Sequence, residues 1–231
     1  FNKDIGNALP LAALNHSDVE LKLKMKQLSQ VSTIEDNTKF KVLPRVQCQL
    51  IGEYIYLDKD ERSKIINNKH QYLIENIDNQ VPYEISSDVI IDNTFEHRIY
   101  FKNPTKEIIF MFQDNDNILN NDHFNYNISD TDGSFNPFTQ LKLLFNRRYR
   151  EEFHQSEFYS QVINFKNYNR VLKDGVYYYS FSLYPEQFQP SGTANLSKID
   201  DFTLEFILDD RFVELVKTKK ILLKVFSKHY N

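Results

Sequence analysis

The stretch FTLEFIL, residues 202–208, decides the fold class of this 231-residue chain. Phenylalanine and leucine fill its even-numbered positions, whereas threonine, glutamate and isoleucine fill the odd-numbered ones. Successive side chains of a β-strand point to opposite faces, so this pattern predicts a strand with one face against a core. The dominant hydrophobic pattern of the chain repeats every two residues, as in β-strands, and not every 3.6 residues, as in α-helices.

Two further segments alternate in the same way. Residues 19–26, VELKLKMK, place Val, Leu, Leu and Met on one parity, opposite one Glu and three Lys. Residues 95–102, FEHRIYFK, place three apolar residues and His97 on one parity. Each segment predicts a strand with one buried and one solvated face. On this parity His97 is expected to be a hydrogen-bonded core histidine rather than a metal ligand.

Shorter strand-like runs occupy much of the remaining chain, at residues 46–57, 72–77, 107–112, 176–183 and 221–226. In the first of them the apolar parity reverses beside Gly52, which predicts a bulge or bend there. Cys48, the only cysteine, is expected to be a buried structural thiol. A single cysteine allows no internal disulfide, which suits a reducing compartment.

Helical patterns are scarce. Asp58 is followed three residues later by Glu61, a capping-box pair that predicts one short helix through Ile66. Residues 148–162 show a weak i, i+4 pattern and are either a helix or an ordered loop. Residues 114–136 are polar enough to form one long exposed loop.

About eight antiparallel strands with long connections predict an all-β sandwich or barrel. We expect an eight-stranded antiparallel jelly-roll sandwich with long loops and one or two short helices, forming a single domain over residues 1–231. No amphipathic helices lie between the predicted strands, which argues against a parallel α/β fold.

Charge and hydropathy exclude several classes of partner. The net charge is −4 and there is no block of five like charges, which argues against nucleic acid or an anionic membrane as the main partner. The most basic run, residues 146–150 (NRRYR), is followed at once by two glutamates and is expected to be a solvated face. No segment approaches the ~20 apolar residues of a membrane span, so membrane insertion is not expected.

A small-polar run, residues 191–198 (SGTANLSK), raises the question of a phosphate-binding loop. Such a loop needs two spaced glycines and a following helix. Here Gly192 stands alone and the next segment is a predicted strand. Pro185 and Pro190 withhold backbone donors, so this segment cannot lie inside a sheet. We therefore predict a corner in which Gly192 supplies the turn.

No other motif supports catalysis or a cofactor. The acidic run at residues 114–125 lacks the glycine and the final glutamate of a calcium loop, and the histidines are not paired at metal-ligand spacings. A Gly-x-Ser-x-Gly nucleophile elbow is absent. We predict no catalytic residue, no metal site and no cofactor. The tyrosines at 177–179 could form a carbohydrate platform, but core or subunit-interface packing is favoured.

Residues 175–186 (GVYYYSFSLYPE) and 189–200 (QPSGTANLSKID) resemble the signature of the major capsid proteins of nucleocytoplasmic large DNA viruses, including iridoviruses, phycodnaviruses and mimivirus-like viruses. The shorter stretches at residues 4–11, 52–58 and 106–113 fit the same family in order. The positions that carry the signature are Pro185, Gln189, Pro190, Ser191, Gly192, Asn195, Ser197 and Asp200.

The resemblance implies the C-terminal half of a double jelly roll, with residues 4–11 at the start of the second jelly roll and the first one absent. It further implies a non-enzymatic homotrimer that forms a pseudo-hexagonal capsomer of an icosahedral shell. The expected partners are sibling copies, neighbouring capsomers and minor capsid proteins. The expected location is the virion, with assembly in the host cytoplasm.

Two alternatives remain open at this point. A lectin-like jelly roll that binds carbohydrate would need an exposed aromatic side chain beside carboxylates in a shallow groove. A cupin-type enzyme would need clustered metal ligands.

Overall fold

The computed structural model describes residues 5–27, 30–31, 47–168, 170 and 172–231. Contacts within the chain divide it into two compact units, residues 1–72 and residues 73–231. In the described ranges, no helix has the length and apolar character needed to cross a membrane.

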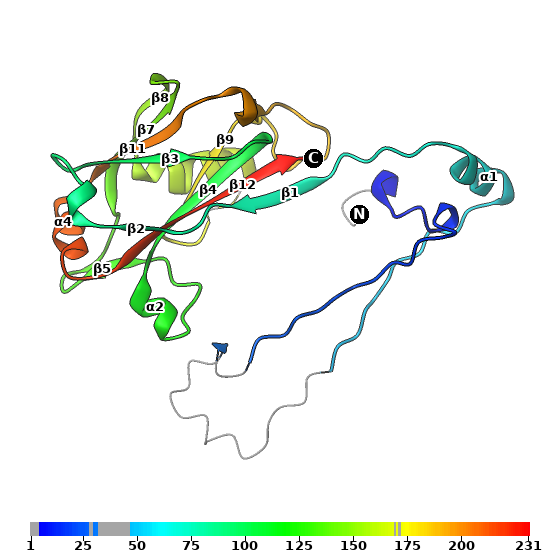
Figure 1. The fold of residues 1–231 in the computed structure, drawn as a ribbon, viewed down its shortest axis with the longest axis horizontal. Coiled ribbons are helices and arrows are strands. Elements are labelled where there is room, and N and C mark those ends of the chain that lie inside the picture. The colour runs from blue at the N-terminus through cyan, green and yellow to red at the C-terminus, as the bar shows by residue number, and fades with distance from the viewer. Residues whose placement is uncertain (1–4, 28–29, 32–46, 169, 171) are drawn as a thin grey trace, which may run out of the picture. The chain divides into compact units, whose positions relative to one another are not determined.

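The second unit consists mainly of antiparallel β-structure in two sheets (Figure 1). The first sheet has the order β1 (Glu75–Asn79), β12 (Ile221–Tyr230), β4 (Pro104–Asp114), with β9 (Val176–Ser180) and β10 (Ala194–Asn195) on β4 and β2 (Tyr83–Ile85) on β12. The second sheet has the order β3 (Thr94–Ile99), β11 (Phe202–Leu208), β7 (Phe138–Phe145), β8 (Arg148–Gln155). A small hairpin joins β5 (Ile128–Asp130) and β6 (Gly133–Phe135).

Strand β11 confirms the prediction from residues 202–208. It lies between β3 and β7, and its buried and half-buried residues alternate along its whole length. Phe206 lies opposite Phe95 on β3 and Leu141 on β7. The apolar parity therefore faces the core, as the sequence pattern indicates.

Aromatic side chains fill the space between the two sheets. Phe110 of the first sheet is fully buried, and its ring centroid lies 5.7 Å from that of Phe206 in the second. Phe138 lies 5.3 Å from Phe206 and 4.7 Å from Tyr177, measured between ring centroids. Burying such a side chain contributes about 1.5–3 kcal/mol, so this cluster is a principal source of stability.

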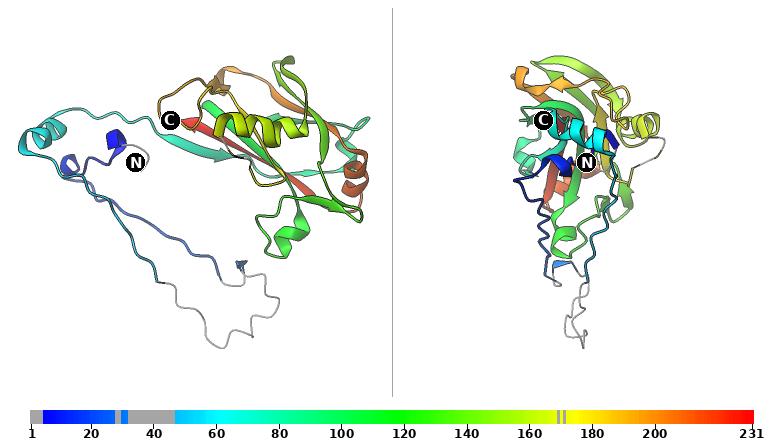
Figure 2. Two further views of the ribbon diagram at one scale, coloured as in Figure 1. Left: turned by 180° about the vertical axis from the view of Figure 1, so that it is seen from behind. Right: turned by 90° about the vertical axis from the view of Figure 1, so that its right-hand side faces the viewer.

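Short helical segments complete the fold (Figure 2). They are α1 (Lys59–Asn67), α2 (Asn115–Leu119), the π-helical η6 (Phe158–Val162), α3 (Ile163–Tyr168), α4 (Asp210–Val216) and four 3-10 turns, η1 (Ile5–Asn7), η2 (Leu11–Ala13), η5 (Ser87–Val89) and η7 (Leu196–Lys198). Helix α1 confirms the predicted capping box: the Glu61 amide donates to Asp58 Oδ1 at 2.7 Å and the Asp58 amide donates to Glu61 Oε2 at 3.3 Å. Tyr159 of η6 is buried and its hydroxyl donates to the Leu141 carbonyl at 3.1 Å.

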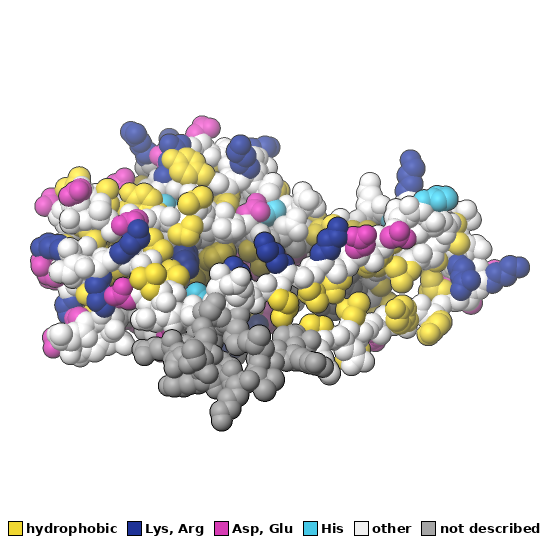
Figure 3. Space-filling view, turned by 60° about the horizontal axis from the view of Figure 1, so that its bottom comes forward, with side chains coloured by type: hydrophobic (Ala, Val, Ile, Leu, Met, Phe, Trp, Pro, Cys, Tyr) yellow, Lys and Arg dark blue, Asp and Glu magenta, His cyan; other side chains and the backbone are white. Residues whose placement is uncertain are grey.

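Two predicted strands are wrong in this structure. Residues 19–26 and the described part of 46–57, residues 47–57, have no strand pairing. The apolar side chains of the first segment are 58–65% exposed, and Tyr56 in the second is 92% exposed. Figure 3 shows hydrophobic side chains lying at the surface among charged ones. Cys48 is also exposed rather than buried, and the predicted bulge at Gly52 has no strand to interrupt. Alternation defines an apolar face, but a strand also needs a neighbour for its backbone hydrogen bonds. The described part of the chain supplies none here.

Two loop predictions also need correction. Residues 148–155 form β8, because a two-residue turn returns them along β7, and only the following residues form helix. Pairing with a neighbour overrides the weak helical pattern. Residues 114–136 contain α2 and the β5–β6 hairpin instead of one long loop. Asp114 caps α2 by accepting from the Asp116 amide at 2.9 Å.

Candidate functional site

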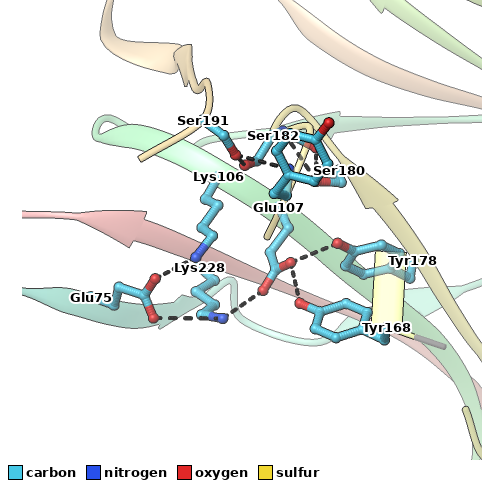
Figure 4. A network of polar contacts seen from close by, with 10 residues as sticks. Glu75, Lys106, Glu107, Tyr168, Tyr178, Ser180, Ser182, Ser191 and Lys228 are labelled. Carbon is cyan, nitrogen blue, oxygen red and sulfur yellow. Dashed lines mark hydrogen bonds and ion pairs between the residues drawn. The ribbon is translucent and has the colours of Figure 1, made fainter. Parts of the chain in front are cut away.

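The predicted corner leads from β9 to β10, and Ser191 is its centre (Figure 4). The Ser191 hydroxyl lies 2.6 Å from that of Ser182 and accepts from the Tyr184 amide at 2.8 Å. The Ser191 carbonyl accepts from the Leu183 amide at 3.3 Å. The two arms of the loop are thus closed on each other. The chain then pairs with the start of β4 as β10.

Gly192 has the predicted role in this corner. Its φ of +129° is a conformation that glycine adopts readily, and a Cβ at this position would lie 3.1 Å from the Phe181 carbonyl oxygen. The chain continues into β10 and the three-residue turn η7, not into the long helix of a phosphate-binding loop. The prediction of a corner is confirmed.

The other signature residues lie at several places in the same segment. Asn195 caps η7 by accepting from the Ser197 amide at 3.2 Å and from the Ser197 hydroxyl at 2.5 Å. The Asp200 carbonyl accepts from the Arg98 guanidinium, which ties the segment to β3. The structure therefore brings together Ser191 with Ser182 and Asn195 with Ser197. The remaining three do not converge on one point: Pro185 is buried, whereas Gln189 and Pro190 are exposed.

A buried ionic network lies beside this corner on the first sheet (Figure 4). Lys106 of β4 donates to Glu75 of β1. Lys228 Nζ of β12 lies 3.6 Å from Glu75 Oε2 and 2.9 Å from Glu107 Oε1. Lys106 and Glu107 are each only 1% exposed. Two ammonium groups and two carboxylates balance one another, as buried charges require.

A β-bulge explains how consecutive residues can join one network. Lys228 pairs with Glu107, but the next residue of β12, His229, pairs with Thr105, so Lys106 is the extra residue of β4. Adjacent side chains of a regular strand point to opposite faces, and a bulge redirects one of them. The bulge therefore places Lys106 and Glu107 within reach of the same pair of partners.

Two tyrosines complete the hydrogen bonding of Glu107. The hydroxyls of Tyr168 and Tyr178 donate to Glu107 Oε2 at 2.5 and 2.7 Å. Burial, together with the nearby charge of Glu107, raises the pKa of both tyrosines well above the usual value. The phenols are therefore neutral donors, and both oxygens of Glu107 have partners. This arrangement stabilises the sheet and has no free acid or base to act on a substrate.

Other predicted candidates are placed in the core. His97 is 8% exposed and contacts the rings of Tyr83 and Phe95 at centroid distances of 5.2 and 6.2 Å. Burial lowers the pKa of His97 to about 4, so it is neutral near pH 7. The tyrosines at 177–179 are at most 4% exposed. This confirms that they pack in the core and do not form an exposed carbohydrate platform. Within the described ranges no group of three or more His, Cys, Asp or Glu side chains could hold a metal ion.

Sequence analysis missed the ionic network. Its members come from residues 75, 106–107, 168, 178 and 228, which only the folded sheet and the neighbouring helix α3 bring together. The one local signal is the pair Lys106-Glu107, which directly precedes residues 108–112, a run that is apolar on both parities. Such a charged pair in a buried strand indicates partners on neighbouring strands.

Comparisons with known proteins agree with this two-sheet architecture. A family described as "Large eukaryotic DNA virus major capsid protein" matches residues 61–231, and one described as "Major capsid protein N-terminus" matches residues 1–58. The major capsid protein of Phaeocystis pouchetii virus is 25% identical over 326 aligned residues, covering 100% of this chain and 61% of its own length. Probable capsid protein 4 of Acanthamoeba polyphaga mimivirus is 31% identical over 173 residues, covering 71% of this chain and 33% of its own.

A solved structure shares the fold. The crystal structure of VP54 from PBCV-1 superposes with a TM-score of 0.61 at 24% identity, covering 77% of this chain and 52% of VP54. The described fold is thus a β-sandwich of two antiparallel sheets with short helices, of the kind found in that capsid protein. The chain belongs to the family of major capsid proteins of large eukaryotic DNA viruses. It spans 61% of the Phaeocystis virus relative and 33% of the mimivirus relative.

Proposed function

We propose that this chain is part of a non-enzymatic major capsid subunit that builds the icosahedral shell of a large DNA virus. The match of the capsid family to residues 61–231 carries the proposal. The buried ionic network supports it, because its charged groups pair with one another and link neighbouring strands. A shell subunit needs such a rigid scaffold and needs no reactive group.

The fold is proposed to be an eight-stranded jelly roll. In chain order its strands are β1, β3, β4, β7, β8, β9, β11 and β12. When these eight strands are numbered 1 to 8 along the chain, the first sheet has the strand order 1-8-3-6 and the second sheet has the strand order 2-7-4-5. This alternation between two packed sheets supports a jelly roll.

The domain boundaries are a further proposal. One domain over residues 1–231 stays a prediction. Contacts within the chain divide it into two compact units after residue 72, and one family match ends at residue 58 while the other begins at residue 61. We propose that residues 73–231 form the jelly roll. We assign residues 1–58 to the N-terminal half of the capsid subunit, in place of the expectation that residues 4–11 begin the second jelly roll. The other strands of that half would cover the apolar side chains of residues 19–25. Adding that half should protect the amides of residues 19–25 from hydrogen exchange; unchanged exchange would contradict the assignment.

Assembly is proposed to follow the family. Three subunits would form a capsomer of pseudo-hexagonal outline, which would contact neighbouring capsomers and minor capsid proteins in the virion after assembly in the host cytoplasm. Three copies close into a ring when one surface patch binds a different patch with the correct rotation. Specific contacts of this kind bury more than about 1,000 Å².

Electron microscopy of the purified full-length subunit tests the proposal. We expect particles of hexagonal outline, or shells tiled by them. A uniform population of monomers at high concentration would overturn it. A carbohydrate-binding function is not favoured by the tyrosines at 177–179, because they are buried.

A further inference from the structure

Two of the five glycines in the chain directly follow an aspartate, at Asp132-Gly133 and Asp174-Gly175. Such a pair can rearrange without an enzyme, because glycine has no Cβ to hinder the approach of its amide nitrogen to the aspartate side chain. Both glycines have positive φ angles, +121° at Gly133 and +78° at Gly175. The two pairs have the same chemistry, so the surroundings of each pair in the fold decide which one reacts.

The first pair lies at the tip of the β5–β6 hairpin (β5 is labelled in Figure 1). The hairpin has three residue pairs, and Asp130 opposite Gly133 is the last pair before the turn. Residues 131–134 are all exposed. A Cβ added to Gly133 would meet no atom within 4 Å. The backbone of this pair can therefore rotate in open solvent, and the end pair of a short hairpin opens at low cost.

The side chain of Asp132 is also free to rotate. The Asp132 amide donates to Asp130 Oδ1 at 2.8 Å, and this bond holds only the main chain of the turn. Among the residues that the structure describes, no hydrogen bond or ion pair holds the Asp132 carboxylate. A side chain without a partner changes rotamer readily, so the carboxyl carbon can reach the nitrogen of the next residue.

The second pair lies in a closely packed turn. A Cβ added to Gly175 would lie 2.2 Å from the Tyr126 carbonyl oxygen, so the main chains of the two segments are in close contact. Lys173 Nζ donates to the Phe124 carbonyl at 2.6 Å and ties the same two segments together. Rotation of the peptide between Asp174 and Gly175 would have to displace this neighbouring segment. The fold therefore protects Asp174.

We propose that Asp132 is a site of spontaneous isoaspartate formation. The Gly133 nitrogen loses its proton and attacks Cγ of the Asp132 carboxyl group, a C–N bond forms, and one water molecule leaves. The attack lies within one molecule and is favoured by proximity. The product is a five-membered succinimide ring. Water then opens the ring at either carbonyl, which restores aspartate or gives isoaspartate, whose main chain runs through Cβ and Cγ. The water lost is regained, so this isomerisation needs no oxidant, reductant or cofactor.

Isoaspartate at this position should loosen the hairpin. It adds one carbon atom to the main chain between Asp132 and Gly133, directly beside the pair that Gly133 forms with Asp130. Ile128 of β5 is 2% exposed and belongs to the core, so the change links an exposed tip to a buried residue. A subunit in an assembled shell is not replaced, so the product would accumulate there. This last consequence rests on the proposed function, whereas the reaction itself does not.

Peptide mapping of the full-length subunit tests the reaction. After several weeks at neutral pH and physiological temperature, isoaspartate at position 132 should exceed that at position 174 by about tenfold or more, as a modestly higher barrier gives. Electron-transfer fragmentation assigns the position. The same incubation in denaturant, where neither pair has packed neighbours, should give similar amounts at both positions. Asp132→Glu is the matched control, because a six-membered ring closes far more slowly and no isomer should form there.

Hydrogen exchange measures the effect on the hairpin. Residues 128–135 of the isomerised protein should exchange faster than those of fresh protein, whereas β11 should be unchanged and incubated Asp132→Glu should show no such change. Absence of isoaspartate at position 132, or equal amounts at both positions in the folded protein, would overturn the inference. Unchanged exchange in a sample rich in the isomer would overturn the predicted loosening. None of these measurements depends on self-association, so they are independent of the proposed function.

Discussion

The Nζ atom of Lys228 lies 2.9 Å from Oε1 of Glu107, and this pair joins the two central strands of the first sheet. Glu107 is 1% exposed, and its second oxygen accepts from the hydroxyls of Tyr168 and Tyr178. A carboxylate so enclosed is tolerated only while its partners remain. The network should therefore act as a unit that fixes the pairing of β12 with β4.

Replacing Glu107 with glutamine should lower the free energy of unfolding by about 3–5 kcal/mol, because Lys228 then lacks its nearest carboxylate in a buried site. Denaturant titration measures the loss. The double variant E107Q/K228M should recover part of it, since both charges are then gone. Glu214→Gln, at the exposed pair with Lys217, should change stability by no more than about 1 kcal/mol. A loss below 1 kcal/mol for E107Q would contradict the structural role of the network.

The stability of the sandwich should depend on the ionisation of His97. Its folded pKa of about 4 lies below the ordinary 6.5, so the unfolded chain binds more protons between these values. The contribution of neutral His97 to the free energy of unfolding is complete above pH 6.5. It is lost as the pH falls toward 4, and the loss is about 3 kcal/mol at most. Since carboxylates also titrate in this range, the test compares the wild type with His97→Phe. The wild type should lose more stability on acidification, and parallel pH curves would show that His97 is not the cause.

Two glycines with positive φ should respond differently to alanine. At Gly175 (φ +78°) a Cβ would lie 2.2 Å from the carbonyl oxygen of Tyr126, whereas at Gly133 (φ +121°) it would meet no atom within 4 Å. Gly133→Ala should cost about 1 kcal/mol from backbone strain alone. Gly175→Ala should cost about 3 kcal/mol or more, because the loop at Tyr126 must move. Thermal unfolding of both variants measures the difference, and equal losses would mean that the close approach at Gly175 is easily relieved.

The corner should depend on the Ser191 side chain. Ser191→Ala removes the contact with Ser182 and leaves the Tyr184 amide without its acceptor, which should cost about 1 kcal/mol. Hydrogen exchange of residues 182–184 should become faster, while β11 should stay protected. Ser129→Ala, at an exposed position of β5, is the matched control and should change neither. Unchanged exchange in S191A would show that other bonds close the loop.

The strands of the second unit could largely be predicted from the sequence, because a half-buried strand needs an apolar residue at every second position. Residues 202–208 show this well, since β11 has a paired strand on each side. The similar alternation at residues 19–26 forms no strand, because local sequence does not specify the neighbour with which a strand pairs. Strand β8 was missed for a related reason, since its pairing depends on the turn at Asn146 and Arg147.

The candidate site likewise has one part that the sequence predicts and one part that it does not. The corner was predictable because prolines exclude this segment from a sheet and glycine permits a turn, and Gly192, predicted to supply the turn, has a positive φ. The ionic network was not predictable, because it depends on the register between β4 and β12 and on one bulge at Lys106. Neither the register nor the bulge is visible in either strand alone.

The most direct test of the central claim is the mass of the purified full-length subunit in solution, measured by sedimentation equilibrium over a range of concentrations. If the function of the sandwich is to associate with other copies of the subunit, the measured mass should correspond to three subunits or to larger assemblies built from them. A mass of one subunit at every concentration, with the sheets folded as described, would contradict that claim.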